Sequence, residues 1–223
     1  MTLMEAVMTR TSQRRYLPDP ISAEQRQQLQ KTINQCCQRS GLRIQLICDH
    51  PAPFDSFIKT YGMLHGVRNY LILAGERGDP HLDEKCGYYG ERLVLLAQML
   101  GLNTCWVAMT YSKIKTAFTV DAGEKLCVVI SLGYGKTQGT GHGKSKTFEE
   151  VTKISGEVPA WFRSGVEAAL LAPTAMNQQK FLLTLSGSQV TAKAGVAFYS
   201  KVDLGIVKYH FELGAGKENF SWA

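Results

Sequence analysis

The sequence lacks the features that would place it in a membrane or cross-link it. No apolar run reaches the roughly 18 residues that a membrane-spanning helix needs, and Met1 starts no signal-like stretch. The six cysteines show no Cys-x-x-Cys spacing and no histidine at metal-ligand spacing, which argues against zinc-ribbon and thioredoxin-type sites. We therefore expect a cytoplasmic protein that holds reduced thiols and no metal.

A block of basic residues is also missing, although the formal net charge is +6. Lysines and arginines are spread along the chain without an aromatic–basic signature or a recognition-helix pattern, so nucleic acid is not an expected partner. The Gly-x-Gly-x-x-Gly fingerprint of a dinucleotide-binding fold is absent too. A pocket for a phosphate-bearing cofactor explains a local excess of positive charge more simply, and a nicotinamide nucleotide would bind only transiently.

What the sequence does contain is a short basic segment near its start, Arg10-Thr11-Ser12-Gln13-Arg14. Two guanidinium groups and a hydroxyl stand at alternate positions, and guanidinium groups bind phosphate oxygens in bidentate fashion. A solvated basic patch or a helix cap is the ordinary alternative for such a segment. The chemistry suits the phosphate tail of a cofactor.

A second segment lies near the other end, where residues 172–179 are Ala-Pro-Thr-Ala-Met-Asn-Gln-Gln. Pro173 interrupts a helical run, and the Thr, Asn and Gln side chains that follow can donate to and accept from the edge of a heterocycle. An ordinary loop between a helix and a strand is the alternative here. Together the two segments look like one flavin mononucleotide (FMN) site that is split across the sequence.

Hydrophobic periodicity predicts helices and strands along the whole chain. Helices are expected at 3–9, 23–40, 54–64, 79–100, 159–171 and 203–213. Strands are expected at 42–49, 69–75, 102–108, 125–132, 181–185 and 191–199. Ser22 and Gly41 are start and stop signals for the second helix. The 223 residues fit one globular domain.

Several motifs resemble those of the nitroreductase-like flavoproteins. Arg10-x-Ser-x-Arg14 matches the N-terminal phosphate motif of that family, and residues 90–107 resemble its core helix running into a Gly-Leu-x-x-Cys-Trp strand. Residues 128–135 resemble a strand that ends in Leu-Gly-Tyr, and residues 172–179 resemble an Ala-Pro-Ser-x-x-Asn-x-Gln segment. The resemblance implies an α+β fold in which helices flank a central, mostly antiparallel sheet.

One departure from the family pattern concerns the order of these motifs. In the family the Ala-Pro-Ser-type segment follows the first helix, whereas residues 36–48 of this chain contain no proline. Residues 90–106 and 205–222 both read as Gly, helix, Gly-containing break and Trp, which suggests two unequal, related lobes at 1–140 and 147–223. The Gly- and Lys-rich residues 135–146 would cross between them. Because the ordinary family builds each flavin pocket from two subunits, we expect a single-chain pseudo-dimer: a monomer with one complete site.

The resemblance also implies residue roles. Arg10, Thr11 and Ser12 would bind the phosphate together with Lys144 or Lys146. Arg14 would lie near the ribityl chain or the N1 and O2 edge of the flavin, where a positive charge stabilises the reduced ring. The remaining contacts to the ring are expected from the C-terminal segment and from one backbone amide near flavin N5; the residues are Pro173, Thr174, Asn177 and either Ala108 or Met109.

The function implied is that of an FMN-dependent oxidoreductase. It would use NADH or NADPH to reduce a nitroaromatic or quinone-type small-molecule acceptor, with the cofactor carrying the chemistry and no dedicated catalytic side chain. Cys105 is interpreted as core packing and not as a redox thiol. The alternative is a degenerate or non-catalytic flavin-binding protein.

Overall fold

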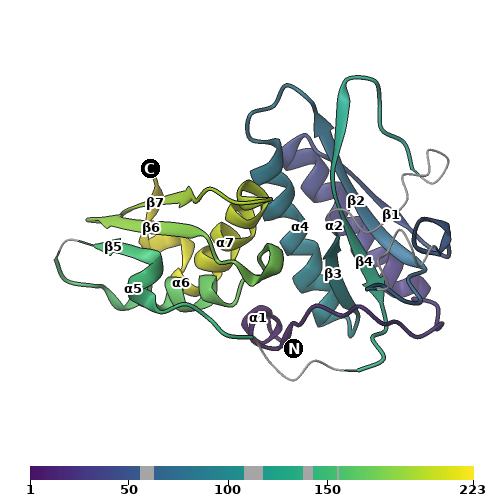
Figure 1. The fold of residues 1–223 in the computed structure, drawn as a ribbon, viewed down its shortest axis with the longest axis horizontal. Coiled ribbons are helices and arrows are strands. Elements are labelled where there is room, and N and C mark those ends of the chain that lie inside the picture. The colour runs from purple at the N-terminus through teal and green to yellow at the C-terminus, as the bar shows by residue number, and fades with distance from the viewer. Residues whose placement is uncertain (56–62, 108–117, 138–142, 155) are drawn as a thin grey trace.

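The computed structural model describes residues 1–55, 63–107, 118–137, 143–154 and 156–223. Its first sheet has the strand order β1-β2-β4-β3, and every neighbouring pair is antiparallel (Figure 1). The strands are β1 (Arg43–Ile47), β2 (Asn69–Glu76), β3 (Asn103–Val107) and β4 (Glu124–Gly133). All four were predicted from the sequence within a few residues.

Strand β2 is buried on both of its faces, as its continuous apolar run predicted. Leu71 and Leu73 pack with residues of helices α2 (Ala23–Ser40) and α4 (Leu82–Met99). The alternate residues Tyr70 and Ile72 pack on the opposite face, in a cluster that contains Tyr16, Phe54 and Leu64. The N-terminal segment therefore completes the core on the face of the sheet that the helices leave open.

The predicted signals at the ends of α2 are present in the structure. The Ser22 hydroxyl accepts from the backbone amide of Gln25, whose side chain caps Ser22 in return. Gly41 ends the helix in the left-handed region at φ 73°, a conformation that favours glycine. The helix expected at 54–64 falls largely on residues outside the described ranges; the turn η1 (Ala52–Phe54) precedes them.

A second sheet of four short strands has the order β5-β6-β7-β8. Strands β6 and β7 form an antiparallel hairpin, whereas β5 and β8 lie parallel to their neighbours. The bounds are β5 (Thr152–Ile154), β6 (Phe181–Ser186), β7 (Gln189–Ala194) and β8 (Ser221–Trp222). The strand predicted at 191–199 was too long, because β7 ends at Ala194 and Tyr199 already caps the next helix.

Helix α7 (Ser200–Ala215) packs against α4 and joins the two parts of the molecule (Figure 1). Two glycines allow the helices to approach. A Cβ on Gly87 would lie 2.0 Å from the carbonyl oxygen of Val202, and a Cβ on Gly205 would lie 2.0 Å from that of Glu84. The remaining helices and turns are α1 (Leu3–Thr9), α5 (Phe148–Val151), α6 (Ala160–Leu170), η2 (Ala175–Asn177) and η3 (Lys217–Asn219).

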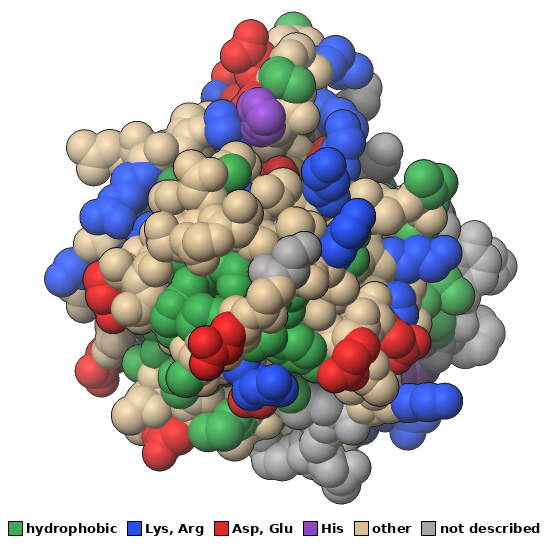
Figure 2. All heavy atoms as spheres, turned by 90° about the vertical axis from the view of Figure 1, so that its left-hand side faces the viewer, with side chains coloured by type: hydrophobic (Ala, Val, Ile, Leu, Met, Phe, Trp, Pro, Cys, Tyr) green, Lys and Arg blue, Asp and Glu red, His purple; other side chains and the backbone are tan. Residues whose placement is uncertain are grey.

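The expected lobes at 1–140 and 147–223 stay a prediction, since residues 138–142 of the crossing lie outside the described ranges. Figure 2 views the molecule from the left-hand side of Figure 1 and shows both acidic and basic side chains around a hydrophobic area. Within the described ranges, none of the helices has the length and apolarity to cross a membrane.

Candidate functional site

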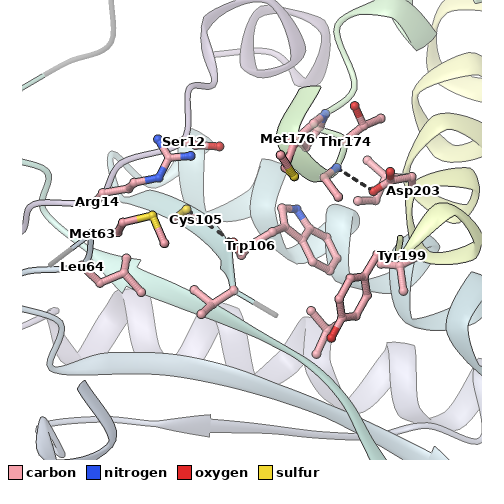
Figure 3. A pocket seen from close by; sticks show the side chains of 16 residues that line it. Ser12, Arg14, Met63, Leu64, Cys105, Trp106, Thr174, Met176, Tyr199 and Asp203 are labelled. Carbon is pink, nitrogen blue, oxygen red and sulfur yellow. Dashed lines mark hydrogen bonds between the residues drawn. The ribbon is translucent and has the colours of Figure 1, made fainter. Parts of the chain in front are cut away.

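One cavity of about 370 Å³ is lined by residues from both ends of the chain (Figure 3). In the view shown, Ser12 and Arg14 lie on one side, Tyr199 and Asp203 lie on the other, and Trp106 lies between them. The lining is predominantly apolar, with a cation and a carboxylate at separate positions. The described residues that line the cavity are Ser12, Arg14, Met63, Leu64, Cys105, Trp106, Val107, Val128, Pro173, Thr174, Ala175, Met176, Tyr199, Val202, Asp203 and Ile206.

The N-terminal wall of the cavity, residues 12–16, is held by its backbone. Ser12 forms a parallel bridge with Thr104 of β3, and the Gln13 amide donates to the Thr104 carbonyl at 2.9 Å. Tyr16 bridges to Gly135, and its amide donates to the carbonyl of His65 at 3.0 Å. Ser12 and Arg14 line the cavity, whereas Gln13 between them is buried. The alternate spacing of the sequence motif thus places its hydroxyl and one of its guanidinium groups in the cavity.

The C-terminal wall, residues 173–179, is held mainly by side chains. Asp203 accepts from the Ala175 amide at 3.0 Å through Oδ1 and from Gln178 Nε2 at 2.7 Å through Oδ2. The Gln179 amide donates to Thr174 Oγ1 at 3.0 Å. Met176 has a φ of 52°, which is unusual for a non-glycine residue. These bonds hold a turn that the backbone alone does not favour.

Asp203 is almost fully buried, with 5% of its surface exposed. Burial raises the pKa of this carboxyl to about 6, against the opposing effect of its hydrogen bonds from Gln178 and Ala175. Burial likewise raises the pKa of the Cys105 thiol. Cys105 lines the cavity as well as packing in the core, but its thiol is kept protonated, which is unfavourable for thiolate chemistry.

Trp106 is positioned by two consecutive residues of α4. Its indole Nε1 donates to Glu91 Oε2 at 3.0 Å. A Cβ on Gly90 would lie 2.5 Å from Trp106 Cη2, so the ring occupies space that only glycine leaves. The second oxygen of Glu91 lies 2.9 Å from His210 Nε2 of α7. A buried polar group thus links the middle of the cavity to the helix that joins the two sheets.

Arg10, predicted to bind phosphate, is not among the residues that line the cavity. Its side chain is buried and its Nε lies 3.8 Å from Glu91 Oε1. This Nε has no hydrogen-bond partner among the described residues. Burial lowers the pKa of the guanidinium, and the negative charge of Glu91 opposes that shift. Phosphate contacts from Arg10 and Thr11 stay predictions, and the observed partner of Arg10 is Glu91.

Of the predicted ligands, Asn177 belongs to the C-terminal wall, and Lys144 and Lys146 are bonded to that wall. Asn177 Nδ2 donates to the carbonyl of Lys144 at 2.8 Å, and Lys146 Nζ donates to the carbonyl of Gln179 at 2.9 Å. None of the three lines the cavity, so their roles as cofactor ligands also stay predictions. Ala108 and Met109 lie outside the described residues.

Comparison with known proteins identifies the family. The family model described as "Putative TM nitroreductase" matches residues 2–215. The chain belongs to this nitroreductase family. No curated protein matches it significantly.

Solved structures share the nitroreductase fold. A putative nitroreductase from Thermotoga maritima is 20% identical, with a TM-score of 0.67 over 98% of this chain and 85% of the other. An FMN-dependent nitroreductase from Clostridium difficile is 14% identical, with a TM-score of 0.53 over 63% of this chain and 91% of the other. A nitroreductase-like protein from Streptococcus mutans is 12% identical, with a TM-score of 0.57 over 69% of this chain and 98% of the other. The predicted α+β class and its antiparallel sheet flanked by helices are thereby confirmed.

Sequence reasoning missed several residues that shape the site of this nitroreductase-family chain. It assigned no role to Asp203 or to Glu91, which hold the C-terminal wall and Trp106 respectively. The sequence contains a weak signal for Glu91, because a carboxylate next to the apolar residues 93–96 of a core helix needs a polar partner if it is buried. For Asp203 the helical pattern gave no signal, since a charged residue in the first turn of a helix is ordinary.

Proposed function

We propose that this protein is an FMN-dependent oxidoreductase that uses NADH or NADPH to reduce nitroaromatic or quinone-type acceptors. Family membership supports a general oxidoreductase role, and a structural neighbour is described as FMN-dependent. For a quinone the overall reaction consumes one NAD(P)H and one proton and yields NAD(P)⁺ and the hydroquinone. The observation that carries the proposal is the cavity into which Ser12 and Arg14 converge with Pro173 and Thr174.

The residues in the cavity fit a flavin mononucleotide. Trp106, Val128 and Ile206 give apolar surface for a planar ring. Arg14 and Ser12 supply a cation and a hydroxyl for the phosphate or for the electron-rich edge of the ring. Arg10, two positions before Ser12, has a buried Nε without a hydrogen-bond partner among the described residues. The volume of about 370 Å³ lies within the usual range of small-molecule sites.

The chain itself contributes orientation and electrostatics. Bound FMN would supply the hydride-accepting and hydride-donating chemistry. The positive charge of Arg14 favours any negative charge that develops in the cavity. Because Arg14 is exposed, salt should weaken that interaction. Asp203 keeps Ala175 and its neighbours in place as part of the wall.

We also propose that each chain is a cytoplasmic monomer that binds one FMN, as a single-chain pseudo-dimer would. Both walls of the cavity come from the same chain, which supports this arrangement. Equilibrium sedimentation of the flavin-loaded protein should give the mass of one chain and a flavin-to-protein ratio of about one. A stable dimer with flavin bound between two chains would contradict it.

Titration of the flavin-free protein with FMN tests the site directly. Arg14→Ala should weaken FMN binding by about 1.5–3 kcal/mol, the range of a hydrogen bond to a charged group. Arg15→Ala is the matched control, because Arg15 is exposed and does not line the cavity. Equal affinities for FMN in both variants would place the cofactor elsewhere.

Anaerobic reduction tests turnover. FMN-loaded protein should lose its yellow colour with NADH or NADPH and regain it with a nitroaromatic or a quinone. Yellow protein that neither nucleotide bleaches supports the alternative, a flavin-binding protein without turnover. One observation favours that alternative: Arg10 of the phosphate motif is paired with Glu91 and does not line the cavity. Protein that takes up no FMN would contradict the oxidoreductase and would support the degenerate form of the alternative.

A further inference from the structure

Of the eight large apolar side chains that the described residues expose, four lie in the lining of the cavity or in the segment that leads to Tyr199. Met176 and Val196 are each 98% exposed, Phe198 is 60% exposed and Met63 is 49% exposed. Met63 and Met176 also line the cavity, and the ring of Phe198 packs edge-on against Tyr199, which lines it too. We call these four residues, Met63, Met176, Val196 and Phe198, the apolar rim.

Two of the segments that carry the apolar rim are bonded to each other. Gln178 Nε2 donates both to the carbonyl of Phe198 at 2.8 Å and to Asp203 Oδ2 at 2.7 Å. One buried carboxylate thereby fixes the turn that carries Met176 to the segment that carries Phe198. The backbone of Met176 is in the left-handed region, at φ 52°, although its side chain is exposed. Strained residues of this kind cluster at ligand-binding sites.

Large apolar side chains exposed together mark binding surfaces, and methionine adapts its shape to varied ligands. Because the rim continues the apolar lining of the cavity outward, a single molecule can occupy both. We propose that the acceptor is amphiphilic: its redox-active ring enters the cavity and its apolar substituent lies on the apolar rim. This inference rests on the proposed oxidoreductase function and assigns the class of acceptor, an aromatic or quinone ring that carries an alkyl chain.

A series of 1,4-benzoquinones with a methyl, butyl or octyl chain tests the proposal on the FMN-loaded protein. In the wild type, kcat/KM should rise about twofold per added methylene from methyl to butyl, roughly half the effect of burying a methylene completely. In the double variant Val196→Ser/Phe198→Ser the butyl-to-methyl ratio of kcat/KM should fall below about two. The ratio within one variant is the measured quantity, so a general loss of activity does not affect it.

Met99→Gln is the matched control, since Met99 is 40% exposed at the end of α4 and does not line the cavity. This variant should keep the wild-type ratio. A wild-type ratio near one, or an equal ratio in the wild type and the double variant, would overturn the proposal.

Alkyl-substituted 1,4-dimethoxybenzenes resemble these quinones but cannot be reduced by the protein. Calorimetry of their binding therefore tests the apolar rim independently of turnover. Affinity that rises with chain length in protein that turns over no acceptor would support the rim and contradict the proposed oxidoreductase. Sedimentation supplies a third readout. Self-association of the wild type that the double variant abolishes, with no dependence on chain length, would show that a second copy covers the rim and would overturn the proposal.

Discussion

The segments 12–16 and 173–179 line the same cavity, but different bonds hold them there. The first is attached to β3 and to its neighbours through backbone amides and carbonyls, as in Gln13 to Thr104. The second depends on the side chains of Asp203, Gln178 and Thr174. The backbone bonds that hold the first wall do not involve the side chains of Ser12 and Arg14, which line the cavity. A side-chain-held wall responds to mutation and, through Asp203, to pH.

The contrast also has an electrostatic side. The N-terminal wall carries Arg14, whereas the C-terminal wall is fixed by the carboxylate of Asp203, and both residues line the cavity. Between the walls, Trp106 is bonded to a second carboxylate, Glu91. A ligand that spans the cavity therefore meets a cation at one end, an aromatic ring in the middle and an acid at the other end (Figure 3).

The largest expected effect comes from the buried ion pair between Arg10 and Glu91. Glu91→Gln keeps an amide that can accept from Trp106 and donate to His210, but it leaves the buried Arg10 without its counter-charge. We expect a loss of about 3–5 kcal/mol in the free energy of unfolding, as for other broken buried ion pairs. Chemical denaturation measures it, with tryptophan fluorescence as a second readout.

Glu84→Gln is the control for that substitution. Glu84 pairs with Lys208 at 2.6 Å, and 29% and 22% of the two side chains are exposed. A pair in such contact with solvent contributes up to about 1 kcal/mol. Similar destabilisation by the two substitutions would mean that the Glu91 network does not support Arg10.

A pH titration probes the C-terminal wall. The pKa of Asp203 is raised to about 6 in the folded state, against about 3.9 in an unfolded chain. The folded protein therefore binds this proton more tightly, and protonation stabilises it as the pH falls from 6 to 4. Relative to Asp203→Asn, the wild type should gain up to about 3 kcal/mol over this range. Denaturation curves for both proteins at several pH values measure the difference, and a pH-independent difference would contradict the shifted pKa.

The comparison of the walls also explains how far the sequence could predict this molecule. Helix α2 was predicted because Ser22 and Gly41 carry local capping information. Strand β7 was predicted too long because apolar residues continue to Tyr199 after the ladder ends at Ala194. Strands β5 and β8 contain three and two residues, which is too short for any periodicity to appear.

For the site, too, the local motifs could be predicted from the sequence and the long-range contacts could not. Ser12, Arg14, Pro173 and Thr174 lie in local motifs, and the structure brings all four to one cavity. The bonds that hold the cavity join residues far apart in sequence, such as Glu91 and His210, which are separated by 119 positions. No local pattern encodes such a contact, because it depends on how α4 and α7 pack. For the same reason the sequence could not show that Arg10 is buried against Glu91.

Removal of the Asp203 side chain should change the free energy of unfolding less than protonation of Asp203 does. Its structural effect should be confined to the C-terminal wall. Asp203→Ala deletes the acceptors of Ala175 and of Gln178, which we expect to cost about 2 kcal/mol. Hydrogen exchange should show faster exchange at the Ala175 amide, while the Gln13 amide of the other wall keeps its protection. Asp203→Asn should retain most of the protection, because an amide can still accept from Ala175 and pair with a reoriented Gln178.

The smallest expected effects come from removing one hydroxyl group from each wall. This pair of substitutions tests directly whether the two walls are held by different bonds. Ser12→Ala should change the free energy of unfolding by less than about 0.5 kcal/mol, because the bond from the Gln13 amide to the Thr104 carbonyl does not involve the Ser12 side chain and the hydroxyl bonds the Cys105 thiol, a weak hydrogen-bonding group. Thr174→Val removes the acceptor of the Gln179 amide at nearly constant shape and should cost about 1 kcal/mol. Exchange at Gln13 and Gln179, measured in both variants, locates each loss. Equal effects at the two positions would mean that the N-terminal wall also depends on its side chains.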